Sequence, residues 1–381
     1  MDAILQDGFR PASRHWGAAG WVRTGHISEL RGFVAALCGF LCAAPAWAGG
    51  PGGDRGYQVE APIVHGNLAV FPVTAGGSYD TAQFLTLDEG IRLGQVTVTE
   101  AGSEQGMIRP GQPPPPRSGG AEVNRLVLYN NSTRPLLLLA GEIVTGGKQD
   151  RVVGSDRIVP AGSGPVDLGV FCVEPGRWVA SSSTFGSMGV QMAQPSVRMP
   201  AMADRNQQRV WDSVRATNER MAESVGGPAA QAAVHGTTSY AKVFASPPVA
   251  KAVAEYGGSE TEQSILRELR GRKAVGVVVA INGRVMWADV FASTDLLAKY
   301  WAKLMRSYVA EAITSASTAS APDRRAAEEF IGTLGGSREV VETEADVFRR
   351  SEITGDGYRV FTLTSLLPKT GYEVHITKLR S

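Results

Sequence analysis

Short apolar runs separated by turn-forming residues fill the first half of the chain. Runs of strand length occupy residues 67–73, 95–99, 123–129, 136–140, 157–159 and 166–173. The segment 85–93 instead predicts a short helix, which Thr86 caps and in which Glu89 completes a capping box. Residues 130–135 predict a hairpin-type turn between the two strands that flank them. Regularly spaced short strands of this kind predict a β-sandwich-like half.

Helical periodicity replaces this pattern in the second half of the chain. Apolar residues at spacings of three and four predict helices over 204–224, 260–270, 293–313 and 322–334. The first of these helices is expected to begin at Asp204, which can serve as its N-cap. Asn282-Gly283 lies between apolar runs at 274–281 and 284–291, and this dipeptide is a strong hairpin signal.

The remaining segments complete a mixed fold. Residues 361–363 and 372–377 predict terminal strands, and 181–199, rich in serine, glycine and methionine, predicts a long loop. We therefore expect an α+β protein. A β-sandwich-like N-terminal half is predicted to pack with a helix-rich C-terminal half that contains a β-hairpin.

The first 48 residues have the organisation of a secretory signal peptide. Arg23 and Arg31 precede a short apolar core over 32–44, and Ala46-Trp-Ala48 supplies small residues at the cleavage positions. A membrane-spanning helix needs about 20 apolar residues, so this core is too short for a stable span. We expect cleavage after Ala48, a secreted or periplasmic protein, and no stable membrane span after cleavage.

The mature chain is expected to form one domain behind a flexible lead. The lead covers 49–66 and the domain covers 67–381, with a β-rich half at 67–180 and an α+β half at 200–381. Four consecutive prolines fall within 101–121, which predicts a disordered insertion in the first half.

Removal of the signal peptide changes the charge and the chemistry of the chain. Without the four arginines and three acidic residues of 1–48, the chain has 34 basic and 34 acidic residues. Zero net charge argues against a nucleic-acid partner, because phosphate binding favours a basic excess. Cys172 is then the sole cysteine, so no internal disulfide is expected. His65, His235 and His375 are too scattered to predict a metal site, and no cofactor is expected.

Charged and polar residues gather at the ends of two apolar runs, between 135 and 178. The candidate ligand-binding residues are Glu142, Lys148, Gln149, Arg151, Glu174, Arg177 and Trp178. Arginines at strand ends suit the bidentate capture of a carboxylate or phosphate, and an indole can provide a stacking wall. The same residues could equally form an internal salt-bridge network that fixes the fold. The sequence leaves both interpretations open.

Catalytic chemistry is a second interpretation of the same residues. Glu142 and Glu174 are the candidate catalytic carboxylates, because paired carboxylates can divide acid and base roles. The run 141–148 lacks the lysine spacing of a phosphate-binding loop, and Gln149 stands where that loop needs a hydroxyl. Cys172, inside an apolar run, is expected to be a buried structural thiol. His375 alternates with apolar neighbours and is expected to be partly exposed.

The chain resembles the ADP-ribosylglycohydrolase-, rhodanese- and phosphatase-associated domain family. The segments that carry this resemblance are 67–73, Gly141-Glu142, 147–151, 160–162, 172–178, the Trp211 helix, the 275–291 hairpin and the Trp301 helix. The resemblance covers roughly residues 60–380. It implies no established activity, because the family name records accompanying domains, and it links the chain to ADP-ribose and phosphate chemistry only by analogy. The signal peptide and the 101–121 insertion depart from the usual family pattern.

These observations favour an exported binding or scaffold module for a polar ligand that contains phosphate, carboxylate or sugar groups. The expected partners are such a small ligand or an envelope protein. One alternative is a hydrolase of a phosphate- or ADP-ribose-like substrate that uses Glu142 or Glu174. The other alternative is a purely structural envelope protein.

Overall fold

The computed structural model describes residues 56–101, 125–177, 181–318 and 320–381. The predicted signal peptide, residues 49–55 of the predicted lead, most of the predicted insertion, and Trp178 lie outside the described residues. The rest of the predicted flexible lead contains two short strands, at 58–59 and 63–65. No helix in these described ranges combines the length and the apolar composition needed to cross a membrane.

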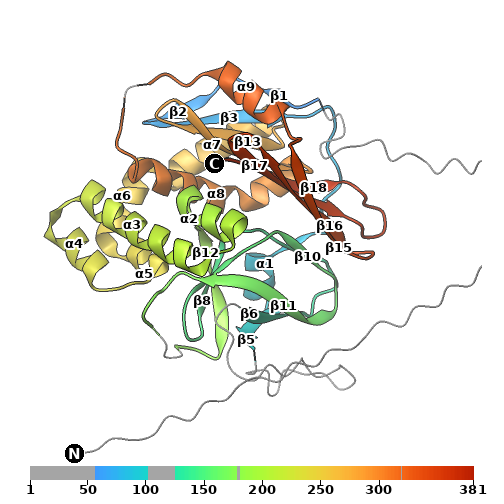
Figure 1. Ribbon diagram of the computed structural model, residues 1–381, viewed down its shortest axis with the longest axis horizontal. Helices are drawn as coiled ribbons and strands as arrows, with labels where there is room; N and C mark the ends of the chain where they lie inside the picture. Colours follow the sequence, from blue (N-terminus) through green and yellow to red (C-terminus); the bar gives the residue numbers. More distant parts are fainter. Residues whose placement is uncertain (1–55, 102–124, 178–180, 319) are drawn as a thin grey trace, which may run out of the picture. The chain divides into compact units, whose positions relative to one another are not determined.

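A nine-stranded sheet joins the beginning and the end of the domain (Figure 1). Its strands lie in the order β1-β3-β13-β14-β18-β17-β16-β15, all pairs are antiparallel, and β2 also pairs with β3. Their bounds are β1 Gln58–Val59, β2 Ile63–His65, β3 Leu68–Thr74, β13 Gly276–Ile281, β14 Arg284–Phe291, β15 Arg338–Glu344, β16 Phe348–Gly355, β17 Tyr358–Ser365 and β18 Glu373–Arg380.

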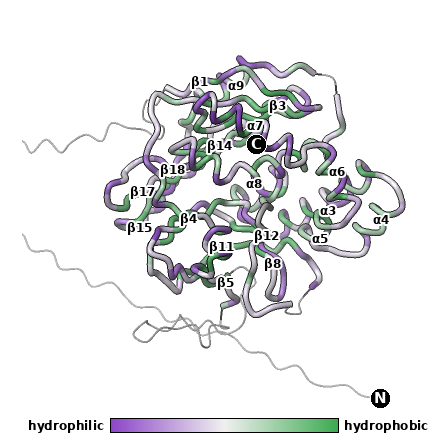
Figure 2. The backbone as a smooth tube through the Cα atoms, turned by 180° about the vertical axis from the view of Figure 1, so that it is seen from behind, coloured by the Kyte–Doolittle hydropathy of each residue, from purple (hydrophilic) through white to green (hydrophobic). Residues whose placement is uncertain are grey.

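Helices cover both faces of this sheet. Successive side chains of a strand point to opposite faces, and in the central strands both sets are apolar. In β13, Val277 and Val279 pack toward α7 (Ser259–Gly271) and α8 (Thr294–Ile313). Val278 and Ala280 pack toward α9 (Arg324–Gly332) on the opposite face. Figure 2 shows the hydrophobic stretches concentrated in the strands and in the helices that cover them.

The second β structure is a closed barrel formed by the strands that follow β3. The strands close in the order β11-β6-β5-β12-β8-β9, and a three-stranded sheet, β10-β7-β4, lies beside them. The bounds are β4 Leu85–Thr86, β5 Val96–Glu100, β6 Arg125–Asn130, β7 Leu136–Leu138, β8 Glu142–Gly146, β9 Arg151–Val153, β10 Arg157–Val159, β11 Ser163–Cys172 and β12 Thr184–Met192. The α1 helix (Leu87–Arg92) has the predicted capping box between Thr86 and Glu89.

The α+β class is confirmed, but the barrel differs from the predicted β-sandwich-like arrangement. The predicted hairpin across 130–135 is also wrong, since β6 pairs with β5 and β11, whereas β7 pairs with β4 and β10. Asn130 explains the change of sheet. Its buried side-chain amide donates hydrogen bonds to the carbonyls of Arg134, Val159 and Pro160, so the chain turns away from β6.

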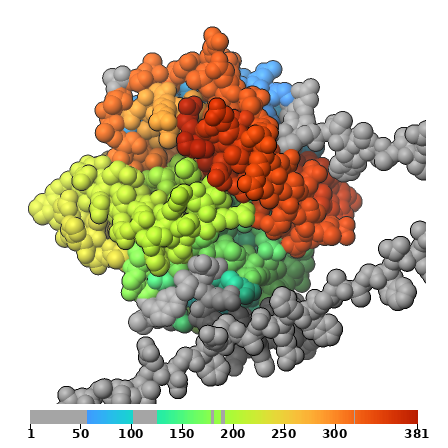
Figure 3. Space-filling view, viewed as in Figure 1, coloured from blue at the N-terminus to red at the C-terminus, as the bar shows by residue number. Residues whose placement is uncertain are grey.

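Helices pack beside the barrel and complete the second half (Figure 3). They are α2 Pro195–Met199, the π-helical turn η1 Pro200–Asp204, α3 Gln207–Val225, α4 Gly227–His235, α5 Tyr240–Ala245 and α6 Pro247–Gly257. The prediction of a long loop over 181–199 is wrong, because this segment contains β12 and α2. Helix α3 begins after Asn206, whose side chain accepts a hydrogen bond from the Arg209 amide, and not at Asp204 as predicted. The predicted Asn282-Gly283 hairpin is confirmed by β13 and β14.

A buried ion pair connects α2 to the nine-stranded sheet. The Arg198 guanidinium donates to both carboxylate oxygens of Asp289 in β14, at 3.2 and 3.0 Å, and both side chains are buried. It also donates to the Thr377 hydroxyl in β18 at 3.2 Å. Gly141, immediately before β8, leaves the space for this arginine, and its φ of +93° is in the region that glycine tolerates. A barrel loop, a helix and the sheet therefore meet at Arg198.

Substitution of Gly141 by alanine tests this contact. A Cβ at Gly141 would lie 2.7 Å from Cδ of Arg198, so the arginine side chain must shift from the position in which it pairs with Asp289. We expect the free energy of unfolding to fall by about 2–5 kcal/mol, from overpacking and backbone strain combined. Urea unfolding measures the change.

Gly162→Ala is the matched control, because Gly162 has a φ of +62° but a Cβ added there would meet no atom within 4 Å. Its free energy of unfolding should fall by only about 1–2 kcal/mol, which is the cost of the left-handed backbone conformation for a residue that has a Cβ. Equal losses in the two variants would contradict the role assigned to the Arg198 contact.

Candidate functional site

Glu174 organises a cluster of charges between the barrel and α5. It is 2% exposed and follows β11. One carboxylate oxygen lies 2.6 Å from the Arg177 guanidinium, and the other accepts from the Lys242 ammonium at 3.1 Å. The Asp150 backbone amide donates a third hydrogen bond. Burial alone would raise the pKa of Glu174, but the hydrogen bonds from Arg177 and Lys242 outweigh burial and lower it.

Asp150 is the second buried carboxylate of this cluster. It accepts hydrogen bonds from the Ser239 hydroxyl at 2.8 Å and from the Gly146 amide at 3.1 Å. Ser239 also caps α5 by accepting from the Lys242 amide, which fixes the start of the helix that carries Lys242. Burial raises the pKa of Asp150, although the Ser239 hydrogen bond opposes the shift.

The predicted candidates Lys148 and Gln149 lie on the loop between β8 and β9, and Arg151 begins β9. All three contact the interior of the cluster. The Gln149 side chain donates to the Glu174 carbonyl at 2.9 Å, and the Lys148 amide donates to the Glu100 carboxylate at 2.9 Å. Arg151 is fully buried, donates to the Gln149 carbonyl at 2.7 Å, and lies 3.8 Å from Glu100. These contacts hold the loop that presents Asp150.

Cys172 is buried beneath this cluster, as predicted. Burial raises the pKa of its thiol to about 11, while the nearby Arg151 charge opposes the shift. A thiol with this pKa remains protonated at neutral pH, when it is a poor nucleophile.

Glu142 does not join the Glu174 cluster. Its fully buried carboxylate forms an ion pair with Lys303 of α8 and accepts from the Leu139 amide at 2.8 Å. Lys303 also lies 2.7 Å from Asp88 of α1, so one ammonium connects two carboxylates. Burial raises the pKa of Glu142, with Lys303 opposing it. The structure thus separates the two predicted catalytic carboxylates into different clusters, and Trp178 lies outside the described residues.

A solvent-accessible cavity opens beside the Glu174 cluster. Its volume is about 330 Å³, and it is lined by Thr145, Gly146, Asp150, Arg177, Ser181, Ser182, Ala241, Lys242 and Ala245. We refer to it as the rim cavity. Arg177 is the only predicted site residue among these lining residues. Asp150 and Lys242 were not predicted as candidates. Asp150 lies within the segment 147–151, which the sequence already singled out. No feature of the sequence near Lys242 marks it, because α5 reaches this position only in the folded structure.

His375 was predicted to be partly exposed, but it is buried in a separate network. It has 0% exposure because β18 lies between β14 and β17 and is covered on both faces. Nδ1 of His375 lies 2.6 Å from Asp156, and Nε2 lies 3.3 Å from Asp289. Burial would lower the pKa of His375, but the two carboxylates outweigh burial and raise it. Within the described residues, no group of His, Cys, Asp and Glu is arranged to hold a metal ion.

These features define an α+β protein whose closed barrel and helix-covered sheet share buried ionic networks and carry a charged rim cavity. The chain matches the family model of ARPP-1, the ARG and Rhodanese-Phosphatase-superfamily-associated Protein domain, over residues 56–377. It therefore belongs to that family, which confirms the resemblance seen in the sequence. No curated protein and no solved structure matches the chain. Family membership assigns no activity to the rim cavity.

The raised pKa of His375 predicts a pH dependence of stability. Because the folded state favours the protonated imidazole, its contribution is fully present below the unfolded pKa of about 6.5 and is lost as pH rises through the higher folded pKa. Urea unfolding from about pH 5.5 to 9 should therefore show wild type losing stability relative to His375→Gln as pH rises above about 6.5.

His235→Gln provides the control, because His235 is an exposed histidine at the end of α4. It should retain the wild-type pH profile. A stability difference between wild type and His375→Gln that stays constant across this range would show that the imidazole does not titrate as described.

Proposed function

We propose that this protein is an exported binding module for a small polar ligand with a phosphate or carboxylate group, which occupies the rim cavity. The observation that carries this proposal is the contrast in solvent exposure between the cationic and the anionic side chains of the cluster. The side chains of Lys242 and Arg177 are 58% and 19% exposed, whereas those of Glu174 and Asp150 are 2% and 5% exposed. The cations therefore face the solvent, and the carboxylates lie beneath them.

This arrangement favours anion binding because the cationic side chains are already held in position. Glu174 holds Arg177 and Lys242 in place before any ligand arrives, so less side-chain freedom is lost on binding. An incoming anionic group meets cationic hydrogen-bond donors first. The hydroxyls of Ser181 and Ser182 also line the cavity. Each donates its hydrogen to a backbone carbonyl, so its oxygen is left to accept from the neutral donors of a polar ligand.

The two alternatives receive less support from the contacts. A hydrolase would need its general base within reach of a substrate proton, but the carboxylates of Glu142 and Glu174 are both buried and both ion-paired. A purely structural role accounts for Glu142 and Arg151. It does not account for the exposure of Lys242 beside an open cavity.

Lys242→Gln tests the proposal in a panel of inorganic phosphate, ADP-ribose, citrate and an uncharged sugar. The phosphates are included because the family description mentions the phosphatase superfamily. At least one anionic compound should raise the thermal midpoint of wild type, and its affinity should fall about tenfold or more in the variant, through loss of a charge-assisted hydrogen bond. Differential scanning fluorimetry followed by isothermal titration calorimetry measures both effects.

Lys251→Gln is the matched control, because Lys251 is an exposed lysine on α6 that does not line the rim cavity. It should bind like wild type. Without ligand, Lys242→Gln should change the free energy of unfolding by less than about 1 kcal/mol, since the lysine is largely exposed. Stabilisation by an anion that persists unchanged in Lys242→Gln would refute this site, as would the absence of any response to the anionic compounds.

A further inference from the structure

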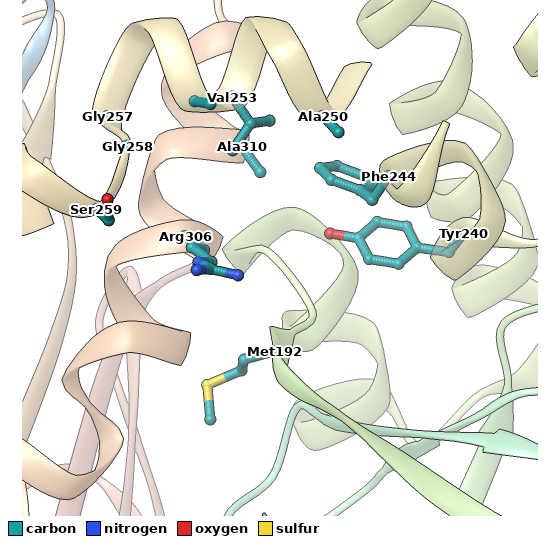
Figure 4. Close-up of a pocket in the computed structure, with 11 residues that line it drawn as sticks. Met192, Tyr240, Phe244, Ala250, Val253, Gly257, Gly258, Ser259, Arg306 and Ala310 are labelled. Atoms are coloured by element: carbon teal, nitrogen blue, oxygen red, sulfur yellow. The ribbon is translucent and has the colours of Figure 1, made fainter. Parts of the chain in front are cut away.

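A second cavity lies on the other side of α5. It has a volume of about 320 Å³ and lies between α5, α6 and α8, with Met192 from the end of β12 at its base (Figure 4). This volume is in the range of small-molecule sites. Its lining residues are Met192, Tyr240, Phe244, Ala250, Val253, Ala254, Gly257, Gly258, Ser259, Arg306 and Ala310. None of them lines the rim cavity, so the two cavities are separate sites.

The walls of this cavity are mostly apolar. The Tyr240 and Phe244 rings, one helical turn apart on α5 and 4.5 Å between centroids, form one wall. Small residues of α6 and α8, including Gly257 and Ala310, line the cavity opposite these rings (Figure 4). The Tyr240 hydroxyl is already occupied, since it accepts from the Gln194 backbone amide at 3.2 Å and donates to the Gln194 side-chain oxygen at 3.5 Å. Tyr240 therefore contributes mainly its ring to the wall.

Arg306 is the charged residue of the lining, and Figure 4 shows its guanidinium pointing into the cavity. Its side chain is 40% exposed, and its Nε atom lies 3.5 Å from the Glu262 carboxylate. Within the part of the chain that the structure describes, its two terminal nitrogens form no hydrogen bond. The planar guanidinium carries these two nitrogens side by side, in the geometry that a carboxylate accepts.

We propose that this cavity binds a small amphipathic carboxylate. The carboxylate would pair with the terminal nitrogens of Arg306, and the aliphatic or aromatic body of the ligand would lie between Phe244, Val253 and Met192. The charge of Arg306 selects an anionic head group over a neutral one, and the apolar walls favour a body that cannot hydrogen-bond. This site is independent of the anion site proposed at the rim cavity.

Octanoate and octan-1-ol are the probes, because they share an apolar tail and differ in the charge of the head group. Isothermal titration calorimetry on the full chain should show octanoate binding about tenfold or more tightly than octanol, from the charged hydrogen bonds to Arg306. Arg306→Gln should reduce octanoate to the affinity of octanol. Arg267→Gln, an exposed arginine of α7 outside the lining, should have no effect.

A second variant tests the cavity itself. Ala254→Trp places a large side chain at an exposed position of the lining and should abolish the binding of both probes, whereas Ala232→Trp, at an exposed position of α4, should not. Lys242→Gln should also leave octanoate binding unchanged, which separates this site from the rim cavity. Equal affinity for the two probes in wild type, no binding of either, or octanoate binding that survives Ala254→Trp would overturn the proposal.

Discussion

The arrangement of this fold depends on a buried group of four charged side chains. Asp156 lies on a loop beside the barrel, Arg198 on α2, Asp289 on β14 and His375 on β18. When His375 is protonated, the two carboxylates balance two cations, so none of the buried charges is left uncompensated. The group extends further, because Tyr308 of α8 donates a hydrogen bond to Asp289. The burial of these groups is tolerable only when all of them are correctly placed, and that requirement fixes the barrel against the sheet.

The same principle operates at the rim cavity with a different outcome. Glu174 and Asp150 are buried and need partners, and the partners they hold are cations that remain accessible to solvent. The need of the buried carboxylates for partners therefore orients Arg177 and Lys242, the groups that we propose to bind an anion. Around Glu142, by contrast, Lys303 is itself buried, so satisfying the carboxylate leaves no charge at the surface. Exposure of the cation, more than the presence of a carboxylate, distinguishes a candidate site from an internal ion pair.

Local patterns in the sequence predicted local structure well. The capping box of Thr86 and Glu89, the Asn282-Gly283 hairpin and the long α8 helix depend on neighbouring residues, which are visible in the sequence. The pairing partners of the strands could not be predicted, because the alternation of apolar residues shows which face of a strand is buried but not which strands pair with it. Asn130 illustrates this limit. Its carbonyl partners include residues about 30 positions away, and these contacts send β7 into a different sheet from β6.

The candidate site was only partly predictable for the same reason. Residues 147–151 and 172–177 stand out in the sequence as charged ends of apolar runs, and they meet in the fold. Lys242 does not stand out, because its pairing with Glu174 spans 68 positions and nothing near it in sequence marks it. His375 was expected to be partly exposed from its alternation. A central strand covered on both faces buries polar and apolar positions alike, provided that the polar ones find partners.

The coupling between Asp156 and His375 tests most directly whether the buried charges join the barrel side to the sheet. These residues are 219 positions apart and meet only in the folded structure. A double-mutant cycle of Asp156→Asn and His375→Gln, measured by urea unfolding near pH 6, should give a favourable coupling free energy of about 1–3 kcal/mol. If the two substitutions are additive within about 0.5 kcal/mol, the network does not hold the two parts together.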